Sequence, residues 1–191
     1  MDSRKQTLVC ALVVPVAVLA VLTAGAVAQA PPVKIGLLAT LEGPFAAGGQ
    51  DGMRGAELAV KQRNGVVAGR KIEIIKASSD AKPDVAVNAT RKLVEQDKVD
   101  IMVGPLSGSE GIAVKEYSKT QPNITFINGS SGAQATTLQS PSPNFFRFNT
   151  DGGQWMVGLG KAAHDKGYKR VMVIAEDYAF PYSQVQGFMT E

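Results

Sequence analysis

The sequence has 191 residues, of which 45% are hydrophobic and 19% charged, and its formal net charge is +3. This composition is that of an ordinary globular protein and excludes an intrinsically disordered or a fibrous chain. Because the positive excess is small and no Lys/Arg cluster lies beside aromatic residues, we expect no nucleic-acid partner.

The first 28 residues have the pattern of a secretory signal peptide. A short basic segment at residues 2–5 precedes residues 7–28, which carry no charge and end in Ala26-Val27-Ala28. Small residues at this point favour cleavage after Ala28. The alternative is an uncleaved membrane anchor, because the apolar run is long enough to cross a bilayer. With cleavage, we expect a periplasmic chain that is not inserted in the membrane and that lacks its single cysteine, Cys10, and hence any disulfide.

Four short, mostly apolar runs predict strands that are buried in a sheet. They are residues 33–39, 71–77, 100–103 and 124–127. A Gly- and Pro-rich loop is expected at 40–49, and helices are expected over 51–63 and 112–119. A further helix is expected to begin at Pro83, with Val85, Ala89 and Leu93 as a stripe along it. This βαβαβαβ order predicts an α/β fold with a doubly wound parallel sheet and helices on both faces.

The remaining elements indicate a second region. After a stiff connector at 140–143, residues 144–148 are expected to be an extended crossing segment. Asp151-Gly152-Gly153 then precedes a predicted helix that runs to about Lys166, with Trp155, Leu159 and Ala162 on its apolar face. Residues 170–175 predict a further buried strand, and the sequence ends within a predicted helix. We therefore expect a first α/β ligand-binding lobe at 29–148 and the beginning of an incomplete second lobe at 149–191.

The stretch from Gly104 to Gly111 reads as a strand end, a tight turn and a helix start. Ser107 or Ser109 is the candidate N-cap, with Glu110 in the first helical turn. Amide groups at such a start have no acceptor within the helix, so an anion such as a ligand carboxylate can bind there. The alternative is a capped turn without a ligand.

Other loops are expected to lie beside this turn. In a parallel sheet the carboxyl ends of the strands share one edge, where ligands bind. Residues 40–45, 78–80, 107–109 and 128–132 are therefore predicted to converge.

The residue inventory argues against catalysis. The spacing of Gly104, Gly108 and Gly111 matches neither a dinucleotide fingerprint nor a P-loop. His164 is the only histidine and is expected on a solvated helix face, so Ser-His-Asp catalysis and His-based metal binding lose their obvious residue. Carboxylates near strand ends leave an enzyme as the weaker alternative: Glu42, Asp80, Glu110, Glu176 and Asp177. We expect no enzymatic activity, no cofactor and no metal.

Several short sequence words, in their order and spacing, resemble the periplasmic leucine/isoleucine/valine-type substrate-binding proteins of ABC transporters, in a truncated form. The words are VKIGLL at 33–38, GP at 43–44, GAELAV at 55–60, GRKIE at 69–73, RKLV at 91–94, VGP at 103–105 and FR at 146–147. The resemblance implies a type I periplasmic-binding-protein fold, in which two lobes close over a ligand by a hinge motion.

The resemblance also implies candidate ligand-binding residues. In the family, the loops after the third and fourth strands hold the ligand carboxylate through a serine side chain and backbone N–H groups. The matching positions are Gly108 with its neighbours Ser107 and Ser109, and Ser130, Ser131 and Gly132. The family usually has serine where this chain has Gly108, so Ser107 or Ser109 is the candidate replacement.

Aromatic residues complete the implied site. A family aromatic residue falls near Gly48, so either Phe45 replaces it or the pocket is larger. The family tyrosine of the second lobe falls at Phe180, which keeps an apolar stacking face but lacks the hydroxyl. Tyr178 and Trp155 are further aromatic candidates, which together indicate a less polar, aromatic or branched carboxylate. The alternative is that these rings only pack the core.

The implied function is that of an exported solute-binding protein that passes a small carboxylate to the permease subunits of an ABC importer. The expected ligand is a branched-chain amino acid or a related apolar or aromatic acid. Two alternatives remain, a ligand-sensing domain of the same fold and a non-functional fragment of a longer binding protein, because the family's second lobe continues well beyond residue 191.

Overall fold

The computed structural model describes residues 30–190, so the predicted signal peptide at 1–28 lies outside the described residues. The strands are β1 (Val33–Thr40), β2 (Val66–Val67), β3 (Arg70–Ser79), β4 (Ile101–Val103), β5 (Thr125–Asn128) and β6 (Phe145–Arg147). The helices are α2 (Ala46–Gln62), α3 (Pro83–Arg91), α4 (Gly108–Ser118), α5 (Gly152–Met156), α6 (Leu159–Asp165) and α7 (Ala179–Met189), with short helical turns η1 (Gly43–Phe45), η2 (Lys92–Gln96) and η3 (Gln134–Thr136).

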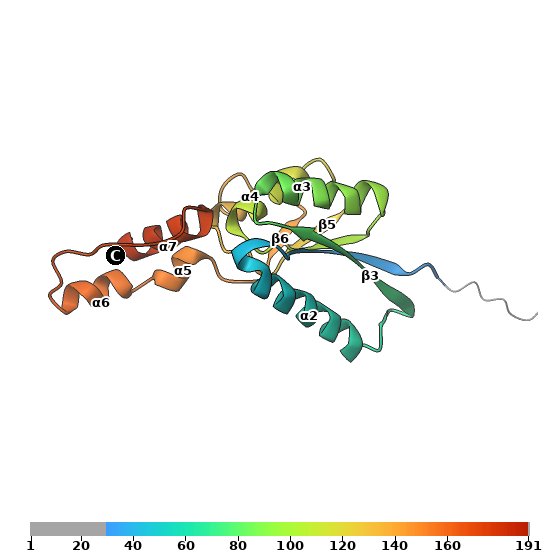
Figure 1. Ribbon diagram of the computed structural model, residues 1–191, viewed down its shortest axis with the longest axis horizontal. Helices are drawn as coiled ribbons and strands as arrows, with labels where there is room; N and C mark the ends of the chain where they lie inside the picture. The colour runs from blue at the N-terminus through green and yellow to red at the C-terminus, as the bar shows by residue number, and fades with distance from the viewer. Residues whose placement is uncertain (1–29, 191) are drawn as a thin grey trace, which may run out of the picture. The chain divides into compact units, whose positions relative to one another are not determined.

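The six strands form one sheet in the order β2-β3-β1-β4-β5-β6. All neighbours in it are parallel except the β2–β3 pair. Helix α2 covers one face, and α3 and α4 cover the other (Figure 1). The predicted doubly wound parallel α/β sheet is confirmed. Strand β1 lies between β3 and β4, so the winding reverses at β1, and ligands bind at such a switch point.

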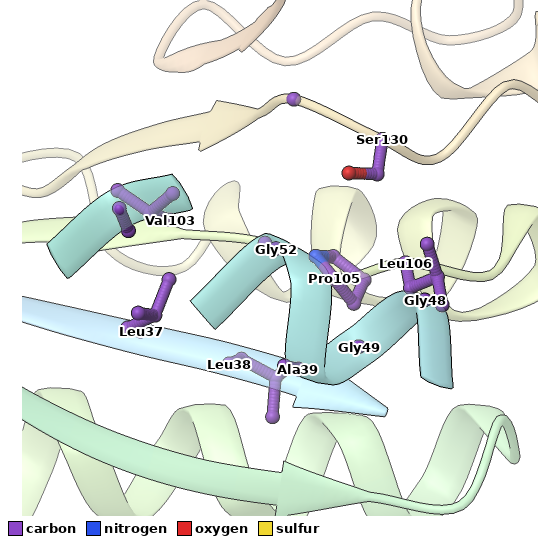
Figure 2. Close-up of a pocket in the computed structure, with 13 residues that line it drawn as sticks. Leu37, Leu38, Ala39, Gly48, Gly49, Gly52, Val103, Pro105, Leu106 and Ser130 are labelled. Atoms are coloured by element: carbon purple, nitrogen blue, oxygen red, sulfur yellow. The ribbon is translucent and has the colours of Figure 1, made fainter. Parts of the chain in front are cut away.

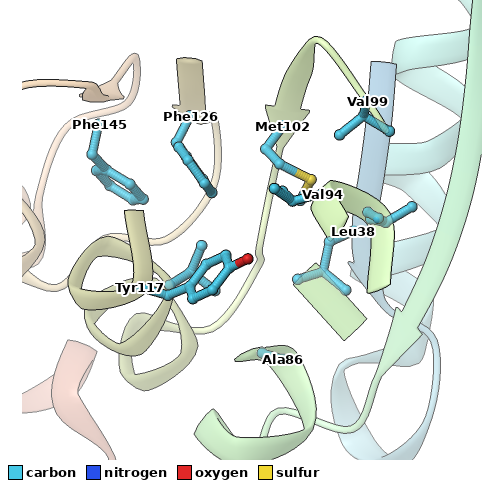
Figure 3. Close-up of a cluster of buried hydrophobic side chains, with 10 residues drawn as sticks. Leu38, Ala86, Val94, Val99, Met102, Tyr117, Phe126 and Phe145 are labelled. Atoms are coloured by element: carbon cyan, nitrogen blue, oxygen red, sulfur yellow. The ribbon is translucent and has the colours of Figure 1, made fainter. Parts of the chain in front are cut away.

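Each face of the sheet has its own apolar cluster. Along β1, Leu38 points to the α3 and α4 side, whereas Leu37 and Ala39 pack with Met53 of α2, because successive side chains of a strand alternate between faces. The larger cluster is drawn in Figure 3; its buried members are Leu38, Ala86, Leu93, Val94, Val99, Met102, Val114, Tyr117, Phe126 and Phe145. The near-continuous apolar run of β1 is therefore explained by burial of its carboxyl-terminal half on both faces.

The predicted stripe along α3 and η2 is confirmed in part, since Leu93 is buried in the larger cluster and Ala89 packs against it. Ala86 and Thr90 are fully buried, whereas Val85 and Ala89 are only half-buried. Small apolar residues occur on both sides of this helix, so their spacing alone did not select the buried one. The Thr90 hydroxyl donates to the Ala86 carbonyl at 2.8 Å, which satisfies a polar group in the core.

Helix α2 begins at Ala46, whereas the sequence predicted a loop over 40–49 and a helix start at 51. One of the glycines that indicated a loop, Gly49, has a packing role instead. An ideal Cβ at Gly49 would lie 1.7 Å from the carbonyl oxygen of Thr40. Glycine at this position allows the first turn of α2 to pack directly on the end of β1.

The sequence did not predict the edge hairpin β2–β3. Val66 and Val67 pair with Lys71 and Arg70 across Ala68 and Gly69. Both turn residues have positive φ, the backbone conformation that a tight two-residue hairpin turn requires.

The region after β6 departs most from prediction. Residues 145–147 of the predicted extended segment form β6, but the helix expected up to about Lys166 is broken by Gly158, whose φ is +83°. Residues 170–175 form no strand, and the side chains of Met172 and Ile174 are 81% and 85% exposed. A strand is held by hydrogen bonds to a neighbouring strand, and none lies beside this run within residues 30–190. The expected lobe boundary at 148 stays a prediction.

No helix in the described part of the chain is long and apolar enough to cross a membrane.

Tyr117 makes the stability of the larger cluster sensitive to high pH. Its hydroxyl donates to Glu95 Oε1 at 3.0 Å. Burial of the Tyr117 hydroxyl is the largest cause that raises its pKa to about 12, and the hydrogen bond to Glu95 and the charge of Glu95 add to it. Folding is favoured by this raised pKa only while Tyr117 is protonated. Its contribution to the free energy of unfolding is fully present below the ordinary tyrosine pKa of about 10 and is lost as the pH rises through 12. Relative to Tyr117→Phe, the wild type should therefore lose about 1 kcal/mol between pH 9 and 11.5, a value reduced for solvent screening of the half-exposed Glu95.

Urea denaturation followed by circular dichroism at both pH values measures this difference. The variant serves as the control, because it keeps the ring and removes the titrating group. A stability difference that is the same at both pH values would contradict the prediction.

Candidate functional site

The start of α4 is set by a capping box. Ser107 is the N-cap: its Oγ accepts from the Glu110 amide at 3.4 Å, and Glu110 Oε2 accepts from the Ser107 amide at 3.0 Å. Ser107, and not Ser109, therefore caps the helix. Gly104 has φ +116°, and an ideal Cβ there would lie 2.1 Å from the Leu38 carbonyl oxygen, so only glycine fits this turn. The amides of Gly108 and Ser109 open the helix and have no acceptor within it.

Glu110 ties α4 to the end of β1. Its buried carboxylate also accepts from Thr40 Oγ1 at 3.0 Å, and Ser79 Oγ lies 3.4 Å from that hydroxyl. The ends of β1 and β3 and the start of α4 are thus joined beneath the predicted site. Glu110 acts as a structural clamp between them, which agrees with the capping role that the sequence indicated.

Asn128 organises the loop after β5. Its Oδ1 accepts from the amides of Ser130 and Ser131 at 3.2 and 2.8 Å, and its Nδ2 donates to the Ser131 carbonyl at 2.8 Å. The family resemblance implied that backbone amides of this loop bind the ligand carboxylate. The amides of Ser130 and Ser131 already donate to Asn128. The Ser131 hydroxyl is also fully buried: an ideal Cβ at Gly111 would lie 2.1 Å from it. Of the two hydroxyls, that of Ser130 is the exposed one.

The start of α7 packs onto both loops. The Ala179 amide donates to Ser109 Oγ at 3.2 Å, so this predicted site hydroxyl holds α7. The ring of Phe180 rests on Gly132, where an ideal Cβ would lie 2.7 Å from Cε2 of the ring. At Gly108 a Cβ would lie 3.0 Å from the Phe180 amide nitrogen. The glycine that replaces the family's serine at position 108 therefore leaves room for the backbone of α7.

The loops after β1, β4 and β5 and the start of α7 border a cavity of about 300 Å³ that is open to solvent. We call it the rim cavity. It is lined by Pro44, Phe45, Gly48, Leu106, Ser107, Gly108, Ser130, Gly132, Trp155, Tyr178 and Phe180. Six of the eight predicted site residues line it, together with both further aromatic candidates, whereas Ser109 and Ser131 do not. Sequence reasoning missed Leu106 as a lining residue, although it is next to Ser107; Pro44 belongs to residues 40–45, which were expected at this edge without being selected singly.

Four aromatic rings form one wall of the rim cavity. Phe45 and Tyr178 meet edge to face with centroids 5.5 Å apart, and Trp155 and Phe180 do so at 5.1 Å. Burial and, to a smaller extent, the charge of Glu176 raise the pKa of Tyr178 above its ordinary value, and its protonated hydroxyl can donate a hydrogen bond at neutral pH. The cavity thus offers aromatic surface, hydroxyl groups and the amino end of α4, and suits a planar apolar group that carries an anion.

The candidates for other chemistry lie away from this cavity or do not form a cluster. The side chain of His164 is 80% exposed on α6, as predicted, and lies 3.6 Å from its neighbour Asp165. Within residues 30–190, no three His, Cys, Asp or Glu side chains are grouped so that they can hold a metal ion.

Comparison with known proteins gives one family and several relatives. A family model described as "Periplasmic binding protein" matches residues 32–190. "Leu/Ile/Val-binding protein homolog 6" of Brucella abortus (strain 2308) is 25% identical over 156 residues, which are 81% of this chain and 39% of that protein.

Two similar solved structures are ABC-transporter solute-binding proteins. One, from Rhodopseudomonas palustris BisB5 in complex with 3,4-dihydroxybenzoic acid, is 26% identical with a TM-score of 0.75, over 84% of this chain and 43% of that one. The other, from R. palustris in complex with benzoate, is 28% identical with a TM-score of 0.76, over 83% and 44%. The chain therefore spans less than half the length of the proteins it matches.

Proposed function

The chain belongs to the periplasmic binding protein family, as its sequence words predicted, and on that premise we propose that it captures a small aromatic carboxylate in the rim cavity. The observation that carries this proposal is the position of four aromatic rings beside the amino end of α4. As a member of this family, the protein is proposed to be exported to the periplasm, to deliver its ligand to the permease of an ABC importer, and to catalyse no reaction.

The aromatic wall supports a ring-bearing ligand. Aromatic pairs favour edge-to-face or offset contacts, and the rings of Phe45, Tyr178, Trp155 and Phe180 are arranged edge to face or tilted around the cavity. A ligand ring can make further contacts of this kind. Two of the similar solute-binding proteins hold benzoates, which is the same ligand chemistry.

The amino end of α4 supports a carboxylate. The helix has eleven residues, and Ser107 and Gly108 at its start line the rim cavity. Unpaired amides and the helix dipole favour an anion at this position. The exposed Ser130 hydroxyl on the neighbouring loop supplies a further donor.

The lining favours a simple acid over an amino acid. Among the described residues that line the rim cavity, none is charged. The ammonium group of a branched-chain amino acid would therefore be removed from water without an anionic partner, which is costly. We therefore place aromatic carboxylates before branched-chain amino acids in the ligand class that the sequence predicted.

Trp155 allows a direct test, because it is the only tryptophan and lines the rim cavity. We expect benzoate to change its fluorescence with a saturable dependence on concentration. Benzamide, which has the same ring without the charge, should bind about tenfold more weakly, since a charge-assisted hydrogen bond contributes roughly 1.5 kcal/mol or more. Leucine should bind more weakly than benzoate.

Phe180→Ala is the matching variant, with Phe148→Ala as its control, because Phe148 is 76% exposed and does not line the cavity. The loss of ring contact at Phe180 is expected to weaken benzoate binding by about tenfold, and the control should leave it unchanged. The absence of a saturable response to benzoate would contradict the proposal. Equal affinity of both variants for benzoate would remove Phe180 from the site.

One observation favours a second candidate, in which binding requires a longer protein than this chain. The apolar run at 171–174 is exposed, although side chains of this kind are usually buried. In the family to which the chain belongs, the matched proteins are more than twice as long as the matched region. A benzoate response in a longer form but not in this chain would support this candidate.

A further inference from the structure

We propose that the ligand is an aromatic carboxylate with an apolar substituent and that the substituent occupies a second cavity, between α2 and the carboxyl ends of β1 and β4. This inference rests on the proposed function and specifies its ligand class. We call this space the α2 cavity; Figure 2 shows the residues around it.

The α2 cavity is apolar and has a volume of about 230 Å³. Its lining residues are Leu37, Leu38, Ala39, Gly48, Gly49, Gly52, Ala56, Val103, Gly104, Pro105, Leu106, Gly129 and Ser130. Among these described residues, only Ser130 has a polar side chain. An enclosed apolar cavity of about 150 Å³ accepts a benzene molecule, so the α2 cavity, which is partly open to solvent, has room for a hydrocarbon group of that size.

Missing side chains on α2 create the space. Gly48 and Gly52 lie one helical turn apart, on the face of α2 that borders the cavity. An ideal Cβ at Gly52 meets nothing within 4 Å, and one at Gly48 meets only Leu106 Cδ2, at 3.5 Å. Unlike Gly49, these two glycines are not required by a close backbone contact. The cavity is therefore open because residues 48 and 52 have no side chains.

The two cavities adjoin. Gly48, Leu106 and Ser130 line both the α2 cavity and the rim cavity. A ligand whose carboxylate and ring lie in the rim cavity can therefore extend an apolar group past these residues. The family resemblance placed a missing aromatic residue near Gly48, with either Phe45 as its replacement or a larger pocket as the result; Phe45 lines the rim cavity, and the α2 cavity lies on the other side of Gly48.

The test compares benzoate with 3-butylbenzoate and 4-butylbenzoate, using Trp155 fluorescence and calorimetry. Burial of each methylene favours binding by roughly fourfold, so the tighter butyl isomer should bind at least about tenfold more tightly than benzoate. Gly52→Leu should fill the α2 cavity and remove this gain, while benzoate affinity stays within about twofold. Gly55→Leu, the same change on the same helix, is the control: both glycines are exposed and meet nothing within 4 Å of an ideal Cβ, but Gly55 does not line the cavity.

The outcomes separate the two proposals. If benzoate binds but neither butyl isomer binds more tightly, or if Gly52→Leu and Gly55→Leu behave alike, the α2 cavity is not a subsite. If none of the three acids binds, the proposed function itself fails. Benzoate binding also reports whether a variant is folded, so a Gly52→Leu protein that no longer binds benzoate is replaced by Gly52→Ala. Gly52→Ala should reduce, in part, the gain in affinity that the butyl group gives. If that gain is unchanged, the inference is overturned.

Discussion

Gly49→Ala is expected to lower the free energy of unfolding by about 3 kcal/mol, because it forces a methyl group into a packed contact between backbone segments. An ideal Cβ at Gly49 would lie 1.7 Å from the Thr40 carbonyl oxygen and 2.6 Å from its carbon. These are backbone atoms of a central strand, which cannot rotate away as a flexible side chain does. The first turn of α2 would have to move off β1, and residues that line both cavities would move with it.

Gly55→Ala is the matched control for this prediction. It lies in the same helix, is exposed, and has nothing within 4 Å of an ideal Cβ. In a helix interior, alanine is more favourable than glycine by about 0.5–1 kcal/mol, so Gly55→Ala should stabilise the protein. Urea denaturation followed by far-UV circular dichroism measures both variants. If Gly49→Ala stabilised the protein as Gly55→Ala does, the close contact between α2 and β1 would be refuted.

Glu110→Ala is expected to destabilise the protein by about 3 kcal/mol, because the variant leaves two buried donors without a partner. Glu110 Oε2 accepts from Thr40 Oγ1 and from the Ser107 amide, each at 3.0 Å. The variant also loses half of the capping box at the start of α4. Benzoate affinity should fall as well, since this box holds the amides of Gly108 and Ser109 at the rim cavity.

Two other variants calibrate this effect. Glu110→Gln keeps the shape of the side chain and one carbonyl acceptor, so it should cost less than Glu110→Ala. Glu57→Ala removes a surface ion pair with Lys76, whose side chain is 53% exposed, and should change stability by less than about 1 kcal/mol. Chemical denaturation of the three variants, with a benzoate titration of each, gives both quantities. A Glu110→Ala protein as stable as Glu57→Ala would contradict the clamp role of Glu110.

The architecture of the sheet followed from local sequence patterns. The apolar run that forms β1 indicated a strand buried on both faces, and the sequence indicated an N-cap at Ser107 or Ser109 with Glu110 in the first turn of α4. Both signals arise within a few residues of the chain, from side-chain alternation and from unpaired helix amides. The order of strands and helices predicted that the loops after β1, β4 and β5 meet, because the carboxyl ends of parallel strands share one edge; residues 78–80, predicted with them, do not line the rim cavity.

Pairing between distant residues was decided only by the tertiary structure. The sequence did not distinguish the roles of the glycines at 48, 49 and 52, yet Gly49 is required by contact with Thr40, whereas Gly48 and Gly52 border a cavity. The pairing of the Ser130 and Ser131 amides with Asn128 likewise depends on how the loop closes. The run at 170–175 has the composition of a buried strand but forms none, because a strand requires a partner that composition cannot supply.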